Sequence, residues 1–195
     1  MAKIIVAITG ASGVVYGTEL VNWLLTNGHQ VFLVISDPAR LVLKQELDWE
    51  IKSCQDAAGY FEAGNLTCFE NSDIAAPIAS GSFIHDGMVV VPCSMSTLAG
   101  IAHGTSNNLI ERAADVCLKE GRNLVLVPRE TPLSLVHLRN MVAVVEAGAR
   151  MVPAMPAFYA GAGGVKDLVY FMVGKILDSL GIDNDAYRRY RRGFD

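Results

Sequence analysis

Short apolar runs alternate with longer amphipathic runs along most of this chain. The short apolar runs predict buried strands, over residues 3–9, 30–35, 88–91, 124–127 and 150–152. Helical spacing follows each of them in turn, over residues 14–26, 39–46, 108–119, 134–148 and 165–180. Strands that alternate with helices in this way predict an α/β fold, a Rossmann-like three-layer domain with a mostly parallel sheet and helices on both faces.

The stretch from residue 48 to residue 86 is less regular than the rest. Only residues 66–69 indicate a short strand there, before a turn at residues 80–82. The chain has 195 residues, of which 51% are hydrophobic, and this is enough to bury the core of one ordinary α/β domain. We therefore expect a single domain over residues 1–182, followed by a polar, arginine-rich tail over residues 183–195.

Charge and cysteine usage exclude several classes of function. The net charge of −4 argues against general binding of nucleic acid, which needs a broadly basic surface. The four cysteines form no Cys-x-x-Cys pair and have no His-rich partner segment, so neither a zinc site nor a disulfide framework is indicated. No apolar stretch approaches the roughly 20 residues of a membrane span, and the opening run is too short for a signal peptide. We expect a soluble, cytoplasmic protein that binds neither metal, membrane nor nucleic acid.

A glycine-rich turn follows the first predicted strand, at residues 9–13. Gly10 and Gly13 allow backbone amides to approach a ligand, and the helix behind them offers its positive end to an anion. The turn therefore predicts a phosphate site, although a tight turn without a ligand is the alternative interpretation. The glycines at 10, 13 and 17 depart from the dinucleotide fingerprint, but Asp37 stands where a ribose-binding acid is expected, so NAD stays open.

A second polar turn follows the third confident strand. Ser94, Ser96 and Thr97 lie between that strand and a predicted helix, where hydroxyls and first-turn amides bind phosphate or polar ring atoms. Helix capping alone also explains such residues. Because the carboxyl ends of parallel strands share one edge of the sheet, two such turns favour one elongated phosphorylated ligand.

Charged residues occur at three further places. Arg112 and Lys119 are seven apart on one helix and share a stripe, which is either half of a site or a salt-bridged surface. Arg129 and Glu130 directly follow a strand, where the arginine suits phosphate and the carboxylate suits proton transfer. Glu46, at the end of the second helix, is an acid/base candidate, but an exposed helix terminus is the more common case.

Two weaker candidates lie near the C-terminal end. Tyr159 and Lys175 together offer a hydroxyl and a cation to a phosphate, but each alone is more often a surface residue. The tail carries Tyr187 and four arginines over residues 188–192, which favours a solvated or subunit-contacting end.

Six segments of the chain resemble the flavin prenyltransferases, the family related to bacterial UbiX, and they span essentially its whole length. The segments are residues 8–17 (ITGASGVVYG), 80–83 (SGSF), 92–98 (PCSMSTL), 108–115 (NLIERAAD), 126–132 (LVPRETP) and 155–159 (MPAFY). A Gly-Ala-Ser-Gly turn alone is a weak signal, whereas the ordered set is specific.

The resemblance implies that reduced FMN is a substrate, which accepts a dimethylallyl group from dimethylallyl monophosphate at N5 and then at C6. It also implies a homo-dodecamer with FMN near subunit interfaces, no metal in the transfer, and prenylated FMN handed to UbiD-type decarboxylases. Ubiquinone synthesis is the pathway that it most commonly suggests.

By residue matching, the resemblance implies two sets of contacts. The FMN contacts are Gly10, Ala11, Ser12, Ser36, Ser94, Met95, Ser96, Thr97 and Arg129. The contacts to the prenyl phosphate are Arg112, Lys119, Glu130, Tyr159 and Lys175. The implied catalytic residues are Ser12, Glu46, Lys119 and Glu130. Cations around an allylic phosphate stabilise its departure, and a carboxylate is needed because N5 and C6 each lose a proton. Lys175 stands where the family often has arginine, which replaces a bidentate contact with a point charge.

Two other functions compete with this one. A flavin-dependent cysteine decarboxylase would share the fold, but the chain lacks the Pro-Ala-Ser-Ala-Asn-Thr and Met-Asn-x-x-Met-Trp types of segment found in those enzymes. A flavin carrier without chemistry of its own would have no use for a second phosphate site, and residues such as Arg112, Lys119 and Glu130 argue against it.

Overall fold

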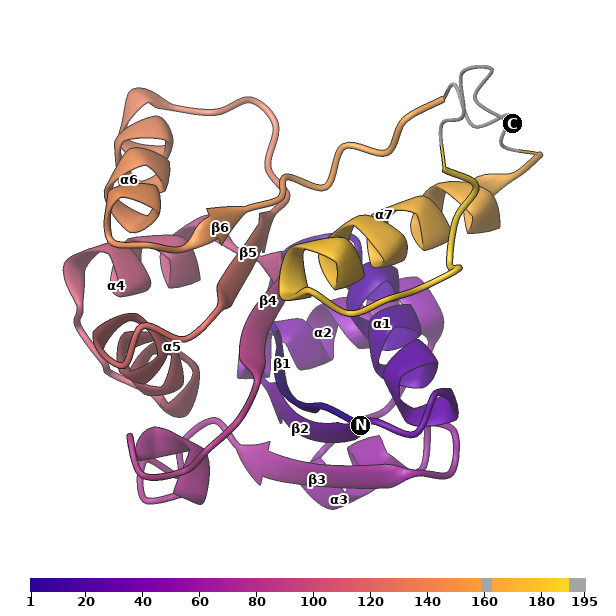
Figure 1. Ribbon diagram of the computed structural model, residues 1–195, viewed down its shortest axis with the longest axis horizontal. Coiled ribbons are helices and arrows are strands. Elements are labelled where there is room, and N and C mark those ends of the chain that lie inside the picture. Colours follow the sequence, from indigo (N-terminus) through magenta and orange to yellow (C-terminus); the bar gives the residue numbers. More distant parts are fainter. Residues whose placement is uncertain (159–162, 190–195) are drawn as a thin grey trace.

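The computed structural model describes residues 1–158 and 163–189 of the chain, and within them six strands form one parallel sheet. The order across the sheet is β3-β2-β1-β4-β5-β6, with β1 near the centre (Figure 1). The strands are β1 (Lys3–Ile8), β2 (Gln30–Ile35), β3 (Asn65–Glu70), β4 (Gly87–Cys93), β5 (Leu124–Pro128) and β6 (Arg150–Met151).

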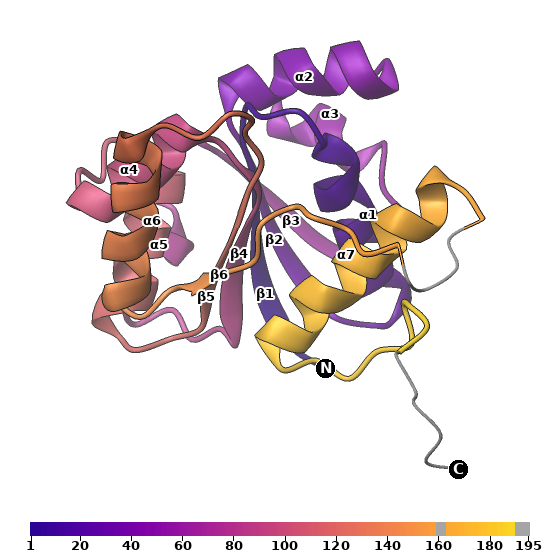
Figure 2. The ribbon, with the colours of Figure 1, turned by 90° about the horizontal axis from the view of Figure 1, so that it is seen from above.

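Helices cover both faces of this sheet, which makes three layers (Figure 2). One face carries α1 (Val14–Thr26), α2 (Asp37–Leu47), α3 (Cys54–Ala58) and α7 (Val165–Leu180). The other carries α4 (Met95–His103), α5 (Leu109–Lys119), α6 (Leu135–Glu146) and the short 3-10 helix η1 (Pro77–Ala79). The predicted Rossmann-like three-layer α/β fold is confirmed.

The central strands are buried on both sides because they contribute to two separate cores. In β1, Ile4, Val6 and Ile8 pack towards α1 and α7, whereas Ile5 and Ala7 pack towards α5. This alternation is the two-residue period of a strand, and it explains why the strands read as continuous apolar runs. All these strands point the same way, so their carboxyl ends form one edge of the sheet and their amino ends the opposite edge.

The irregular stretch at residues 48–86 contains structure that its sequence pattern did not predict. It holds α3 and η1, and its short strand is β3, which pairs with β2 along the whole length of β2. The five residues of α3 are too few to show a helical period. A reciprocal pair of hydrogen bonds between Ser53 and Asp56 starts α3, and its packing on β3 holds it.

Candidate active site

Four loops meet at the carboxyl edge of the sheet, after β1, β2, β4 and β5. The loop after β1 lies against the start of α2 so closely that a side chain on Gly10 would overlap Pro38. The backbone N–H of Ser36, at the end of β2, donates to the carbonyl of Ile8 at 3.0 Å. The glycine turn and Ser36 therefore form one continuous wall.

Thr9 ties that wall to the loop after β4. Its buried hydroxyl donates to the carbonyl of Pro92 at 2.7 Å and accepts from the backbone N–H of Ser94 at 2.8 Å. A threonine directly after a strand is a weak signal for this role, because its two partners come from the end of β4 and from the residue that follows β4. The side chain sets the distance between the two polar turns.

The first turn of α1 already holds an anion from the chain itself. Gly13 has φ 97°, a left-handed conformation that suits glycine, and its N–H points at Glu46. The Glu46 carboxylate accepts from the amides of Gly13 at 3.0 Å and Val14 at 3.2 Å. The glycine pattern predicts a phosphate at the start of α1, whereas in the structure the carboxylate of Glu46 from α2 accepts from the amides there. Glu46 is thus an exposed helix-end residue that also belongs to the turn.

Arg129 contacts the glycine turn from the opposite side. Its Nε donates to the carbonyl of Ser12 at 3.0 Å, and its two terminal nitrogens bond to no residue within the described part of the chain. Ser12, Arg129 and Glu130 are all exposed, so ligand can reach them. The Glu130 carboxylate accepts from the N–H of its neighbour Thr131 at 2.9 Å.

Tyr16 lies beside this group, and the sequence pattern gave it no role. Burial raises the pKa of its phenol, while the nearby Arg129 guanidinium lowers that pKa and the Glu46 carboxylate raises it. A side chain on Gly13 would crowd the Tyr16 ring. Its spacing indicates this location, because Tyr16 follows Gly13 by three residues and therefore lies about one helical turn further along α1.

The loop after β4 forms the start of α4. The Ser94 hydroxyl accepts from the N–H of Thr97 at 3.2 Å and donates to the Thr97 hydroxyl at 3.0 Å. The amides of Met95 and Ser96 are the other two of the first turn, and such amides have no partner inside their helix. Ser96 is exposed and Met95 half-buried, so the start of α4 presents donors to the carboxyl edge. Ser36 plays the same capping role for α2, since its hydroxyl accepts from the N–H of Ala39 at 3.2 Å.

The two predicted phosphate cations of α5 lie towards opposite ends of that helix. Arg112 lies one turn from the start of α5, which is hydrogen-bonded to Asn71 just after β3, and Lys119 is the last residue of α5. Arg112 donates to the carbonyl of Ala79 at 3.3 Å and pairs with Asp115 at 2.9 Å. Lys119 pairs with Glu120 at 2.6 Å beside Gly81, and α5 ends there, just before β5 begins at the amino edge. The four residue steps of β5 separate the two edges by roughly 13 Å.

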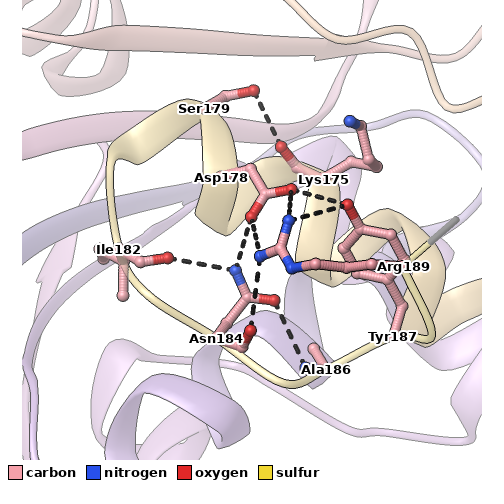
Figure 3. A network of polar contacts seen from close by, with 8 residues as sticks. All are labelled: Lys175, Asp178, Ser179, Ile182, Asn184, Ala186, Tyr187 and Arg189. Carbon is pink, nitrogen blue, oxygen red and sulfur yellow. Dashed lines mark hydrogen bonds and ion pairs between the residues drawn. The ribbon is translucent and has the colours of Figure 1, made fainter. Parts of the chain in front are cut away.

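Lys175 lies in the second half of α7, exposed to solvent. That end of the helix is joined to the amino edge, because Asn123 donates to the carbonyl of Ser179 at 2.9 Å. Figure 3 shows Lys175 beside a polar network that involves Asp178 and the start of the tail. Tyr159, the other predicted contact to the donor phosphate, lies outside the described residues.

The described residues contain neither a candidate metal site nor a candidate membrane-spanning helix. No group of three or more His, Cys, Asp or Glu side chains in residues 1–158 and 163–189 is arranged to hold a metal ion. Over the same residues, no helix is long and apolar enough to cross a membrane.

Comparison with known proteins finds close relatives over nearly the whole chain. The family model described as Flavoprotein matches residues 1–177. The curated protein named flavin prenyltransferase UbiX from Alkalihalophilus pseudofirmus is 47% identical, over 95% of this chain and 94% of its own. The protein of the same name from Methanothermobacter thermautotrophicus is 46% identical, over 96% of this chain and 94% of its own.

Solved structures of similar sequence have the same fold as this chain over nearly its whole length. AnUbiX, solved in complex with FMN and dimethylallyl pyrophosphate, has a TM-score of 0.91 and 43% identity, with 98% of each chain covered. A dodecameric FMN-dependent UbiX-like decarboxylase from Escherichia coli O157:H7 has a TM-score of 0.88 and 44% identity, covering 97% of this chain and 100% of its own. The peptidyl-cysteine decarboxylase EpiD is 16% identical with a TM-score of 0.61, a likeness of fold alone.

Proposed function

This chain belongs to the flavin prenyltransferases of the Flavoprotein family, and we propose that it transfers a dimethylallyl group from dimethylallyl monophosphate to N5 and C6 of reduced FMN. The observation that carries the proposal is that Glu46 and Arg129 both contact the glycine turn after β1. Glu46 accepts from Gly13 and Val14, and Arg129 donates to Ser12, so an acid and a cation are held on the same backbone segment.

The carboxyl edge fits FMN in three respects. Small residues at 10–12 leave room for a flat ring, Arg129 has terminal nitrogens free of described partners, and the amides of Met95 and Ser96 suit a phosphate. Since Glu46 occupies the start of α1, we assign the FMN phosphate to the start of α4, with Ser36 and Arg129 beside it. Gly10, Ala11 and Ser12 then contact the ring system.

Bound reduced FMN supplies the nucleophilic N5 and C6 positions. Around it, the chain's residues hold protons and charge. Glu46 is anchored through the amides of the turn, so its carboxylate is positioned next to Ser12 to receive a proton. Tyr16 lies near both the Glu46 carboxylate and the positively charged Arg129 guanidinium.

We propose that Arg112, Lys119, Glu130, Tyr159 and Lys175 bind the donor phosphate and that different copies of the chain supply them. Support comes from the distance between the two edges of the sheet and from the E. coli relative, which is described as dodecameric. Cations from a second copy would then stabilise the leaving phosphate, and Glu130 would donate a proton to it.

The proposed function also names the compound that donates the prenyl group and the enzyme that receives the prenylated flavin. We propose the monophosphate as donor, while AnUbiX was solved with dimethylallyl pyrophosphate, so both compounds belong in the assay. A UbiD-type decarboxylase is the proposed recipient of prenylated FMN, in ubiquinone synthesis or a related pathway. A cytoplasmic location is supported by four free cysteines, which suit a reducing compartment.

Mass spectrometry of the flavin tests the proposal. The protein is incubated anaerobically with reduced FMN and either donor, and we expect a heavier flavin with a changed absorption spectrum. Lys119→Ala and Glu130→Ala should lower turnover roughly 100-fold or more while FMN binding stays intact. Unmodified flavin with both donors would exclude the prenyl transfer and leave a carrier or an oxidising flavoprotein. Loss of FMN from either variant would move that residue into the FMN site.

A further inference from the structure

The loop of residues 79–83 begins at the last residue of η1 and contains the SGSF segment, to which the candidate active site gives no role. The loop is a tight turn, because the N–H of Phe83 donates to the carbonyl of Ser80 at 3.1 Å and the hydroxyls of Ser80 and Ser82 are 2.8 Å apart. The Phe83 ring packs edge-on against Phe32 in the core, with ring centroids 4.9 Å apart. The end of the loop is therefore anchored on the sheet.

Three carbonyl groups of this loop accept hydrogen bonds from arginines. Arg122, which follows the end of α5, donates from one terminal nitrogen to the carbonyl of Phe83 at 2.8 Å and from the other to the carbonyl of Gly81 at 2.5 Å. Arg112, in the first half of α5, donates to the carbonyl of Ala79 at 3.3 Å. Because a guanidinium presents its donors in a rigid fork, the single half-buried side chain of Arg122 fixes the separation of two loop carbonyls.

Lys119 lies against the same loop. Its ammonium pairs with the carboxylate of Glu120 at 2.6 Å. A Cβ atom on Gly81 would overlap that carboxylate and would lie 3.1 Å from the Lys119 nitrogen. Gly81 has no positive φ, so this close approach, rather than the backbone conformation, requires a glycine here. The pair of Lys119 and Glu120 therefore rests on the segment whose carbonyls Arg122 holds.

We propose that Arg122 is a positioning residue for the prenyl transfer, which holds the loop of residues 79–83 and, through it, the ammonium of Lys119. This inference rests on the proposed function, in which Lys119 binds the donor phosphate. A lysine has a flexible stem, and its pair with an exposed carboxylate fixes it only weakly. A firm loop beside the lysine limits the positions of the ammonium, so less order is imposed when the donor binds. Both terminal nitrogens of Arg122 donate to the loop, so its contribution is to the loop rather than to the phosphate.

Arg122→Ala tests the proposal, with Arg150→Ala as the matched control. Arg150 also donates to a backbone carbonyl, that of Ser179, which keeps a second donor in Asn123. We expect Arg122→Ala to raise the KM for the prenyl donor roughly ten-fold and to lower kcat less than about three-fold, because the lysine remains but is no longer preorganised. The FMN dissociation constant should stay unchanged, and Arg150→Ala should keep the wild-type KM.

Arg122→Lys separates positioning from charge. Lysine keeps the positive charge but lacks the fork that reaches two carbonyls, so the KM for the donor should stay closer to that of Arg122→Ala than to that of the wild type. A wild-type KM in Arg122→Lys would show that Arg122 acts through its charge alone, and this would overturn the proposal.

Gly81→Ala approaches the same pair without changing Arg122. Its methyl group displaces the Glu120 carboxylate and the Lys119 ammonium, so the KM for the donor should rise by a similar factor. Gly59→Ala is the matched control, because a Cβ atom there meets only an ordinary contact at 3.4 Å. Should Arg122→Ala fail to fold, as judged by far-UV circular dichroism, Gly81→Ala and Arg122→Lys still decide the question.

Two further measurements on the full chain without ligand do not depend on turnover. In hydrogen exchange, the amides of residues 79–83 should exchange faster in Arg122→Ala than in the wild type. In labelling with an amine-acetylating reagent, read by mass spectrometry, Lys119 should react faster in Arg122→Ala, with the exposed Lys3 as internal reference.

The outcomes separate this inference from the proposed function. Unchanged exchange of the loop together with unchanged labelling of Lys119 in Arg122→Ala would overturn the inference, as would a wild-type KM in an Arg122→Ala protein that prenylates FMN. If the wild type leaves FMN unmodified with either donor, the proposed function fails. Exchange and labelling then still decide whether Arg122 positions Lys119.

Discussion

Glu46 shows how one side chain serves both the fold and the site. It belongs to α2, yet its carboxylate satisfies the first amides of α1, which would otherwise attract a phosphate. The same carboxylate faces the turn that carries Ser12. The negative charge at this place therefore comes from the protein, and it is positioned before any ligand arrives.

Glu46→Gln separates the two roles. Glutamine keeps an oxygen that accepts from Gly13 or Val14, but it carries no charge and takes up no proton. We expect turnover to fall roughly 100-fold or more, whereas the FMN dissociation constant should change by less than about ten-fold. Turnover by mass spectrometry and FMN binding by fluorescence quenching check this.

The matched control for that change is Glu50→Gln, since the exposed Glu50 pairs with Lys44 away from the turn. This variant should keep full turnover. If Glu46→Gln lost FMN as steeply as it lost turnover, Glu46 would have only a structural role.

At the scale of elements, the start of the C-terminal tail, residues 183–189, packs against α7. Asp178 accepts from Asn184 at 2.9 Å, from Tyr187 at 2.8 Å and from Arg189 at 2.7 Å (Figure 3). A side chain on Gly174 would overlap the Tyr187 ring, so the glycine makes room for it. Described residues 183–189 thus pack on the domain, and α7 is fixed near its C-terminal end.

Asp178→Asn should weaken this contact in a pH-dependent way. Burial raises the pKa of Asp178, but the hydrogen bonds from Arg189, Tyr187 and Asn184 together outweigh burial and hold it below its ordinary value near 3.8. A lowered folded-state pKa means that the charged form stabilises the fold above about pH 4, and that this stability is lost as pH falls through the folded value. We expect the variant to melt about 2–4 °C below the wild type at pH 7.

Thermal melting over a pH series measures that difference, which should shrink below pH 4. Asp185→Asn is the control, because Asp185 is an exposed carboxylate in the same segment. A gap between wild type and Asp178→Asn that stays constant down to pH 3 would show that the charge of Asp178 is not the cause.

At the scale of the whole molecule, Lys119 and Glu130 lie at opposite edges of the sheet. If both act on one donor phosphate, they must come from different copies. Co-expression of a Lys119→Ala chain with a Glu130→Ala chain should then restore activity, because some sites receive an intact lysine and an intact glutamate. Random mixing of the two chains predicts about a quarter of wild-type activity.

Turnover of the mixed protein is compared with that of each variant alone. A mixture of Glu130→Ala and Glu130→Gln chains serves as control and should stay inactive. Mixed chains that remain as inactive as the single variants would place both residues in a site built by one chain.

Sequence reasoning predicted the fold class and most elements well. The helices at residues 14–26 and 165–180 and the strand at residues 30–35 have the predicted bounds. It also predicted that polar turns meet after β1 and β4. The elements follow from local pattern, because the period of the apolar side chains distinguishes helix from strand. The meeting of the polar turns follows because parallel strands end at a common edge of the sheet. The short α3 and η1 escaped prediction because capping and contact with β3 and α5, rather than period, hold them.

What the sequence by itself determined is therefore the alternation of elements, the parallel sheet and the polar residues at its carboxyl edge. Only the tertiary structure decided that Glu46 closes the start of α1, that Lys119 lies at the far edge of the sheet and that an apolar stripe of α6 is exposed. The physical reason is that period identifies the face of an element on which a residue lies. Which neighbour meets that face depends on how distant parts of the chain pack, and a local pattern does not contain that information.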